Sequence, residues 1–228
     1  MLGKLYNKWR MRSQKGKEQQ REYAFLTDIK GVVHVGANRG SERHLYGSFN
    51  LDVLWVEADP RLFKQLKKNI KDYHRQKAVN ALVSETDGDN ATFYVASNNG
   101  ASSSMLPMQG HSDMFPGVTV SDQIELKTAT LKRIMQDNIE DPSRFDALVI
   151  DVQGAELQVL KGAFDAIRMF KYLKVEAADF PAYENAAHID EIVDYCEGCG
   201  FRVLDRIEFA HKEGIGSFYD VIFIRADA

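Results

Sequence analysis

Short apolar runs alternate with amphipathic segments along most of the chain. The runs have the length of buried strands, and the segments between them carry apolar residues at helical spacing. The predicted strands are 31–35, 52–57, 78–83, 145–151 and 172–177. The predicted helices are 40–48, 60–73, 155–168 and 188–199. Short buried strands separated by helices predict an α/β protein with a parallel sheet and crossover helices.

The rhythm changes between residues 84 and 128. Extra strands are predicted at 91–95 and 124–128, followed by a helix at 130–138. Between those strands, residues 97–123 are rich in Ser, Asn, Gly, Met and Pro and predict a long loop. Such a loop in a compact domain is usually functional or disordered, so residues 97–123 are a candidate functional insertion. The chain then ends in two predicted strands, 201–208 and 218–225, joined by a glycine-containing turn.

Charge is distributed unevenly over the 228 residues, whose net charge is −4. Residues 1–23 hold seven Lys or Arg against two Glu, so the remainder carries −9. We therefore predict a basic helical arm at 1–28 and one globular domain at 29–228. The amphipathic arm, residues 2–24, favours packing on its own domain or a second subunit over docking on an anionic membrane. With no long apolar run and no leader sequence, the compartment expected is the cytoplasm.

The most informative segment is the glycine turn after the first predicted strand. Gly36 and Gly40 permit close approach of the backbone to a ligand, and Asn38 between them tolerates left-handed torsions. Glu57 ends the second strand, 21 residues beyond Gly36. That spacing is typical of an acid that binds ribose hydroxyls. The segment therefore predicts an adenosine-containing cofactor.

The glycine turn also bears on whether the cofactor carries phosphates. The middle glycine of the dinucleotide fingerprint is absent, which disfavours NAD and favours a ligand without phosphates, such as S-adenosylmethionine. Backbone at Gly36, Ala37 and Asn38 would line its methionine portion. Backbone at Ala81 and Leu82 would flank the adenine, whose amine would meet Ser84 or Asp87.

A second set of polar residues follows the buried strand at 145–151. Asp151 is delivered to the same sheet edge as Gly36 and Glu57, where ligands bind in open α/β sheets. This placement favours a functional Asp151 over a simple helix cap. Glu156 lies in the first turn of the next helix, where a structural role at the helix dipole and a role in chemistry are equally supported.

Five segments together resemble the FkbM-type methyltransferases, over about residues 30–225. They are Val33–Gly40, Val56–Pro60, Ser102–Met105, Ile150–Gly162 and Val175–Ala177. The resemblance implies a seven-stranded, mostly parallel class I methyltransferase (Rossmann-like) fold with helices on both faces and a C-terminal antiparallel strand pair. It also implies S-adenosylmethionine as methyl donor and O-methylation of a hydroxyl on a sugar, glycan or natural product. Three departures are His34, where an acid is common before the turn, Gln153, where glutamate is common, and Ala58-Asp59-Pro60, where another proline-containing turn is more usual.

Candidate site residues follow from these patterns. The donor-binding set is His34, Gly36, Ala37, Asn38, Gly40, Glu57, Ala58, Ala81, Leu82 and Asp151. Methyl transfer to oxygen needs an aligned acceptor and removal of a proton, for which Asp151 is the first candidate and Glu176 the second. Ser102, Ser103 and His111 would cover the acceptor, although a lone His in a polar loop is more often solvated.

Other chemistry is less well supported. Asp151, Glu176 and Asp179 lie near one sheet edge, but no recognised metal-ligand spacing is present. Cys196 and Cys199 form a C-x-x-C pair at a helix end, which favours free thiols over redox or zinc chemistry. The acidic domain disfavours a nucleic-acid acceptor, so a small molecule or carbohydrate is expected. The alternative function is a catalytically silent donor-binding or scaffold protein that docks through its basic arm.

Overall fold

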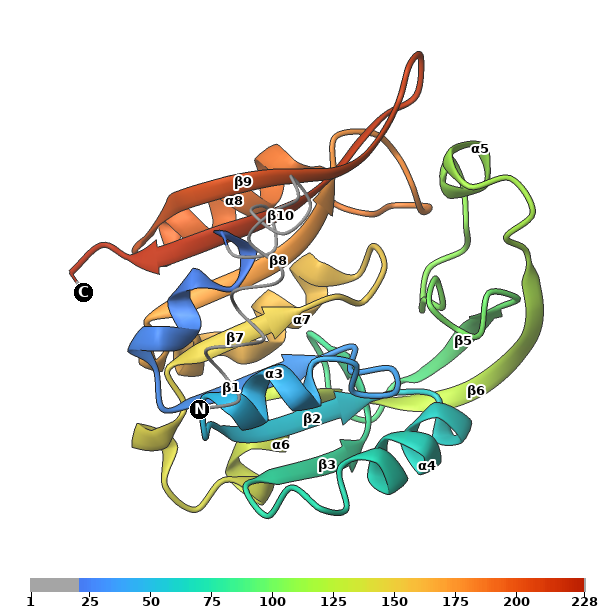
Figure 1. The fold of residues 1–228 in the computed structure, drawn as a ribbon. Helices are drawn as coiled ribbons and strands as arrows, with labels where there is room; N and C mark the ends of the chain where they lie inside the picture. Colours follow the sequence, from blue (N-terminus) through green and yellow to red (C-terminus); the bar gives the residue numbers. More distant parts are fainter. Residues whose placement is uncertain (1–20, 228) are drawn as a thin grey trace.

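The computed structural model describes residues 21–227 and centres on a seven-stranded sheet. The strand order is β3-β2-β1-β7-β8-β10-β9 (Figure 1). The strands are β1 (Gly31–Val35), β2 (Asp52–Glu57), β3 (Gln76–Asn80), β7 (Ala147–Ile150), β8 (Tyr172–Ala178), β9 (Phe201–Lys212) and β10 (Gly216–Arg225). Neighbours from β3 to β8 pair in parallel, and β10 pairs antiparallel with both β8 and β9. The predicted class I fold, with its C-terminal antiparallel pair, is confirmed.

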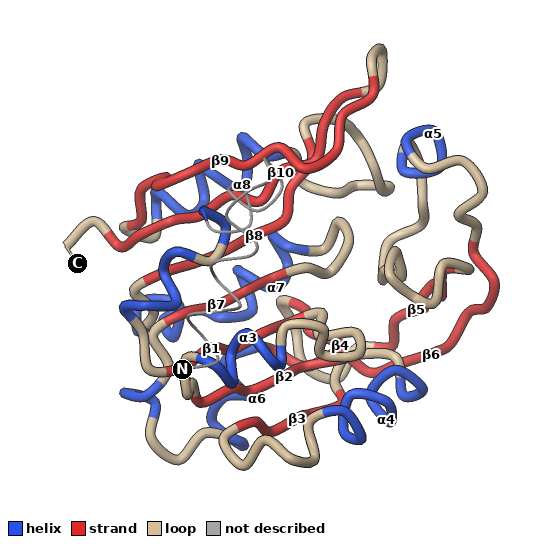
Figure 2. Tube along the Cα trace, viewed as in Figure 1, coloured by secondary structure: helices blue, strands red, loops and turns tan. Residues whose placement is uncertain are grey.

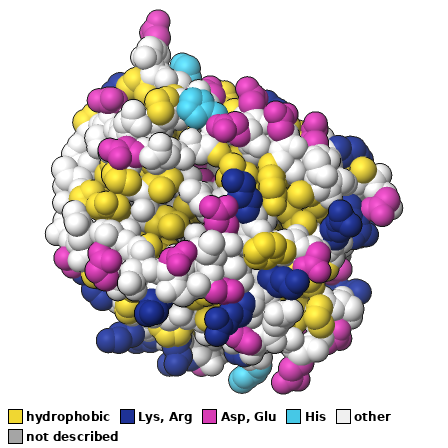
Figure 3. Space-filling model, turned by 180° about the vertical axis from the view of Figure 1, so that it is seen from behind, with side chains coloured by type: hydrophobic (Ala, Val, Ile, Leu, Met, Phe, Trp, Pro, Cys, Tyr) yellow, Lys and Arg dark blue, Asp and Glu magenta, His cyan; other side chains and the backbone are white. Residues whose placement is uncertain are grey.

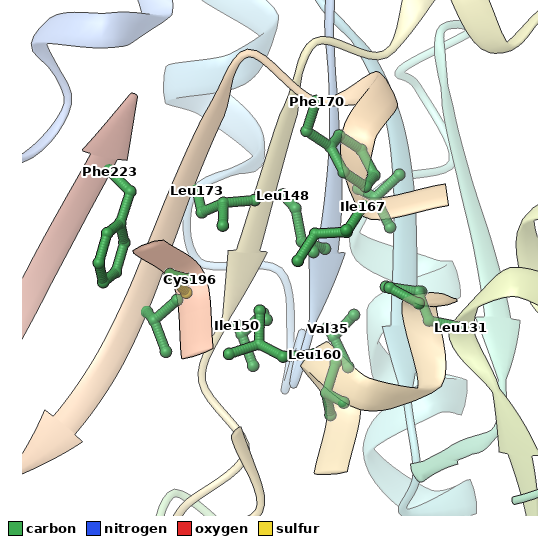
Figure 4. Packing of buried hydrophobic residues seen from close by; sticks show 14 of the residues in the cluster. Val35, Leu131, Leu148, Ile150, Leu160, Ile167, Phe170, Leu173, Cys196 and Phe223 are labelled. Carbon is green, nitrogen blue, oxygen red and sulfur yellow. The ribbon is translucent and has the colours of Figure 1, made fainter. Parts of the chain in front are cut away.

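Helices cover both faces of this sheet because its central strands are apolar on both sides. One face packs against α6 (Leu131–Asn138), α7 (Glu156–Ala163) and α8 (Ile189–Gly198). Figure 4 shows this cluster, with Leu148, Ile150 and Leu173 from the sheet against Leu160 and Cys196. The other face packs against α3 (Arg43–Ser48), α4 (Pro60–Asn69) and the 3₁₀ helix η1 (Ala24–Asp28).

The region between β3 and β7 forms a smaller three-stranded sheet in the order β4-β6-β5. Its strands are β4 (Leu82–Ser84), β5 (Asn90–Ala96) and β6 (Val120–Thr130). The predicted loop at 97–123 contains the short helix α5 (His111–Met114). Figure 2 shows that the loops following β1, β7 and β8 face β5, β6 and α5. The insertion therefore lies opposite the carboxyl ends of the parallel strands.

Several predicted elements have other bounds in the structure: the helices predicted at 40–48 and 60–73 are Arg43–Ser48 and Pro60–Asn69, and the strand predicted at 124–128 is Val120–Thr130. Two further elements change in kind. The strand predicted at 78–83 is two strands, because the chain leaves the main sheet at Ala81 and β4 pairs in parallel with β6. The helix predicted at 155–168 ends at Ala163, where Phe164 takes a left-handed φ of 48°. The chain then continues as a 3₁₀ helix, η3 (Phe164–Met169), and another, η2 (Pro142–Arg144), precedes β7.

Most of the predicted basic arm lies outside the described residues, so its docking stays a prediction. Phe25 and Leu26 of η1 are buried against the sheet. Within residues 21–227, no helix is long and apolar enough to cross a bilayer. On the face shown in Figure 3, Lys and Arg side chains are interspersed with Asp and Glu.

Candidate active site

A cavity of about 450 Å³ opens where the carboxyl ends of β1, β2 and β7 meet the insertion. From the main sheet it is lined by the glycine turn, by Glu57 and Ala58, and by Asp151 to Gln153. Ala81 to Val83 lie along it on another side, and Asn98 to Ala101, Ser103 and Met105 come from the insertion. Ligands of open parallel sheets bind at this edge, and the volume is within the usual range for a small-molecule site.

The glycine turn is fixed by both neighbouring strands. The amides of Gly36 and Ala37 both donate to the carbonyl of Val56 at 3.0 Å. Gly36 has a φ of 85°, and a Cβ there would lie 1.7 Å from the backbone oxygen of Asp151. Only glycine fits this crossing of β1 and β7. Gly40 lies outside the cavity lining, and its missing side chain leaves room for Leu66 of α4.

Glu57 is buried and organises the turn through its carboxylate. Its Oε2 accepts the amide of Asn38 at 2.7 Å, and its Oε1 accepts the amide of Asp59 at 2.8 Å. Burial raises the pKa of Glu57 to about 7, although both backbone hydrogen bonds oppose the rise. A carboxylate has about four acceptor positions, so two stay available toward the cavity.

His34 lines the cavity beneath the turn but is not ionised. Its ring is buried beside Trp55 and Tyr46, and Nδ1 lies 3.1 Å from the Tyr46 hydroxyl. Burial, together with the positive charge of Lys174, lowers the pKa of His34 to about 3. His34 is therefore a neutral group at neutral pH.

Asp151 and Glu176 are joined by a residue that the sequence analysis did not assign to the site. Gln153 has a φ of 60°, and its Nε2 donates to Asp151 Oδ1 at 2.8 Å and to Glu176 Oε1 at 2.7 Å. Its Oε1 accepts the hydroxyl of Tyr183 at 2.9 Å. Asp151 lines the cavity, whereas Glu176 lies behind Gln153. Gln153 lies inside the Asp151–Glu156 motif, and that position could have marked it as a site residue. No pattern in the sequence marks Tyr183.

The two acids of this cluster share an unusual environment. Burial raises the pKa of Asp151. Burial and the neighbouring negative charge of Asp151 raise the pKa of Glu176 well above its ordinary value. A raised pKa makes the carboxylate form a stronger base, which is the direction that favours a proton acceptor.

The loop residues take different positions. Ser103 lines the cavity, and its Oγ accepts the amide of Ala96 at 3.0 Å. Ser102 is buried beside it, outside the lining, where its Oγ accepts from the Asn98 side chain at 2.9 Å. His111 is buried against Tyr183, Phe115 and Phe218, so the solvated interpretation is wrong. Tertiary packing of α5 against the C-terminal hairpin, which the loop sequence does not encode locally, removes it from water.

Several other candidates have structural roles. Asp87 accepts the backbone amide of Thr130 at 2.8 Å and lies outside the cavity lining, as does Ser84. Glu156 is buried and accepts the amides of Val152 and Gly154, which holds the turn before α7. Asp179 accepts the amide of Ser217. Cys196 and Cys199 are free thiols, and residues 21–227 contain no group of three ligands that could hold a metal ion.

A sequence model of the methyltransferase FkbM domain matches residues 34–203. The chain belongs to this family. The methyltransferase is also 23% identical over 172 residues to the 2-O-methyltransferase NoeI of Sinorhizobium fredii (strain NBRC 101917 / NGR234). That match covers 72% of this chain and 69% of NoeI.

Solved structures show the same fold at low sequence identity. One is the 1,6-didemethyltoxoflavin-N1-methyltransferase of Burkholderia thailandensis with bound S-adenosylhomocysteine. It has a TM-score of 0.51 and 12% identity, over 92% of this chain and 77% of that one. Another is M. capricolum TrmK with S-adenosyl-homocysteine, which has a TM-score of 0.50 and 6% identity. That match covers 90% of this chain and 67% of TrmK. The methyltransferase therefore has the class I fold.

Proposed function

We propose that this methyltransferase transfers a methyl group from S-adenosylmethionine to a hydroxyl of a sugar, glycan or natural product. The observation that carries the proposal is that one cavity unites the glycine turn, Glu57 and Asp151. These residues supply close backbone approach, an acceptor for ribose hydroxyls and a carboxyl group near the reacting centre. The 2-O-methyltransferase relative supports oxygen as the methylated atom.

The residues of the cavity fit the donor. Glu57 retains acceptor capacity for the two ribose hydroxyls after its two backbone hydrogen bonds are counted. The backbone at Ala81 and Leu82 would flank the adenine, and the turn at Gly36 to Asn38 would line the methionine portion. When bound, this donor supplies an electrophilic methyl group on a sulfonium.

A dinucleotide fits the same turn poorly. A pyrophosphate needs free backbone amides at the glycine turn. Here the amides of Gly36 and Ala37 donate to Val56, and the amide of Asn38 donates to Glu57. Three of the donors that a pyrophosphate would use are already occupied, which favours a ligand without phosphates.

Asp151 is the proposed general base. Its carboxylate would accept the proton of the acceptor hydroxyl, so that the oxygen could take the methyl group that a bound donor supplies. Gln153 holds Asp151 in position through a hydrogen bond and separates it from Glu176. The acceptor is expected to be a small molecule or carbohydrate, because the chain beyond residue 23 carries a net charge of −9 and the face in Figure 3 mixes positive and negative side chains.

The first experiment is a calorimetric titration with S-adenosylmethionine, S-adenosylhomocysteine and NAD. Saturable binding of the two sulfur ligands, without NAD, supports the donor assignment. A panel of hydroxyl acceptors then tests turnover, with Asp151→Asn as the variant that should retain donor binding and lose transfer. No binding of either sulfur ligand by folded protein would overturn the proposed function. Donor binding without transfer across the panel would favour the catalytically silent alternative.

A further inference from the structure

The cavity has a second end, away from Glu57, whose chemistry the proposed function does not yet use. It is lined by Tyr23, His34, Glu42 and Lys174. If Glu57 holds the ribose, the nucleoside occupies the side of Ala81 and Leu82. The amino-acid portion of the donor then extends beneath the glycine turn toward this second end. That portion carries a positively charged α-ammonium.

Two of the titratable groups at this end are already satisfied. Lys174 is buried, and its Nζ lies 2.6 Å from Asp220 Oδ1 and 3.1 Å from Glu22 Oε1. Its charge is therefore balanced within the protein, and its ammonium also lies over the ring of Tyr23. His34 is neutral and bonded to Tyr46. Neither Lys174 nor His34 supplies a negative charge to a ligand.

Glu42 differs from these groups. It is half-buried, follows the glycine turn and directly precedes α3, yet its side chain makes no cap hydrogen bond. Within residues 21–227, no ion pair and no hydrogen bond to another side chain is found for its carboxylate. Burial raises the pKa of Glu42, and the negative charge of Asp151 raises it further. A partly desolvated carboxylate of this kind is stabilised by a cationic partner.

We infer that Glu42 is the counter-ion for the α-ammonium of the methyl donor, an inference that rests on the proposed function. The charge distribution of the cavity fits this assignment. An S-adenosylmethionine molecule carries two positive groups, the ammonium and the sulfonium. The cavity lining holds three carboxyl groups, Glu42, Glu57 and Asp151, and none of them forms an ion pair with a lysine or arginine within residues 21–227. With Glu57 assigned to the ribose, Glu42 lies at the second end and Asp151 near the reacting centre.

The test compares ligands that share the nucleoside but differ in the amino-acid portion. 5′-Methylthioadenosine has the ribose, adenine and sulfur of the donor and lacks the ammonium. In Glu42→Gln, affinity for S-adenosylmethionine and S-adenosylhomocysteine should fall about 10- to 100-fold, which is the range for one charge-assisted hydrogen bond. Affinity for 5′-methylthioadenosine should stay within about twofold, and this ligand also reports that the variant is folded.

Two further variants sharpen the test. Glu57→Gln should weaken all three ligands, because it changes the ribose site that they share. Glu42→Asp keeps the charge and should retain more affinity for S-adenosylmethionine than Glu42→Gln.

The outcomes separate this inference from the proposed function. Unchanged affinity of Glu42→Gln for both amino-acid-bearing ligands overturns the role of Glu42 and leaves the donor assignment standing. An equal loss for 5′-methylthioadenosine also overturns it, because the effect would then be on the whole cavity. If the unaltered protein binds none of the three ligands, the donor assignment itself fails.

Discussion

Glu57→Gln is the most informative substitution in the proposed ribose site. The carboxylate accepts two backbone amides on different oxygens, those of Asn38 and Asp59. Glutamine has the same shape but only one acceptor oxygen, so one of these amides would face an NH₂ group. Leaving a buried donor unpaired costs about 1–3 kcal/mol of folding stability. The variant should therefore fold, with a lowered melting temperature.

The effect on ligand binding is larger and depends on pH. Two ribose hydroxyls that donate to a carboxylate contribute about 3 kcal/mol together, so Glu57→Gln should weaken binding about 100-fold at pH 8. Burial, together with the negative charges of Asp59 and Asp151, raises the pKa of Glu57 to about 7. The acceptor form therefore increases as pH rises through 7. The affinity of the unaltered protein should increase about tenfold between pH 6 and pH 8.

The assay is a calorimetric titration with 5′-methylthioadenosine at pH 6, 7 and 8, since this ligand has no amino acid to titrate in that range. The unaltered protein should bind more tightly at each higher pH, whereas Glu57→Gln should bind weakly at all three. Equal affinity of the two proteins at pH 8 would refute the ribose assignment. A pH dependence that persists in Glu57→Gln would assign the titration to another group, with Glu156 the first to examine.

Three further predictions concern stability and turnover. Gly36→Ala should prevent stable folding, because its Cβ would lie 1.7 Å from a backbone oxygen. Gly88 has the same φ of 85° but lies in open space, so Gly88→Ala should lower the free energy of unfolding by only about 1 kcal/mol, measured by thermal melting. Lys174→Met should lower the free energy of unfolding by about 3–5 kcal/mol, because it leaves the carboxylates of Glu22 and Asp220 without their cation. Adding Asp220→Asn to this variant should restore part of the lost stability, as measured by chemical denaturation. Gln153→Glu should reduce turnover, with donor affinity changed less, because a third carboxylate would replace the amide that donates to both acids; equal losses in both measurements would contradict the positioning role.

The sequence determined the framework of the donor site. The run of apolar residues before Gly36, and Glu57 at the end of the next run, placed both on the correct strand ends because parallel strands share one carboxyl edge. The same argument placed Asp151, and the structure finds all three on one cavity. These inferences succeeded because they depend on local periodicity and chain connectivity.

Only the tertiary structure decided which side chains meet. Two of the partners of Gln153, Glu176 and Tyr183, lie 23 and 30 residues farther along the chain, and Glu22 pairs with Lys174 of β8. His111, in a polar loop, is buried because residues distant in sequence close around it. Such contacts join residues that are distant in the sequence, so no local sequence pattern predicts them. The sequence therefore placed Gly36, Glu57 and Asp151 at the carboxyl edge of the sheet, and the folded packing decided which charges at that edge are paired and which line the cavity.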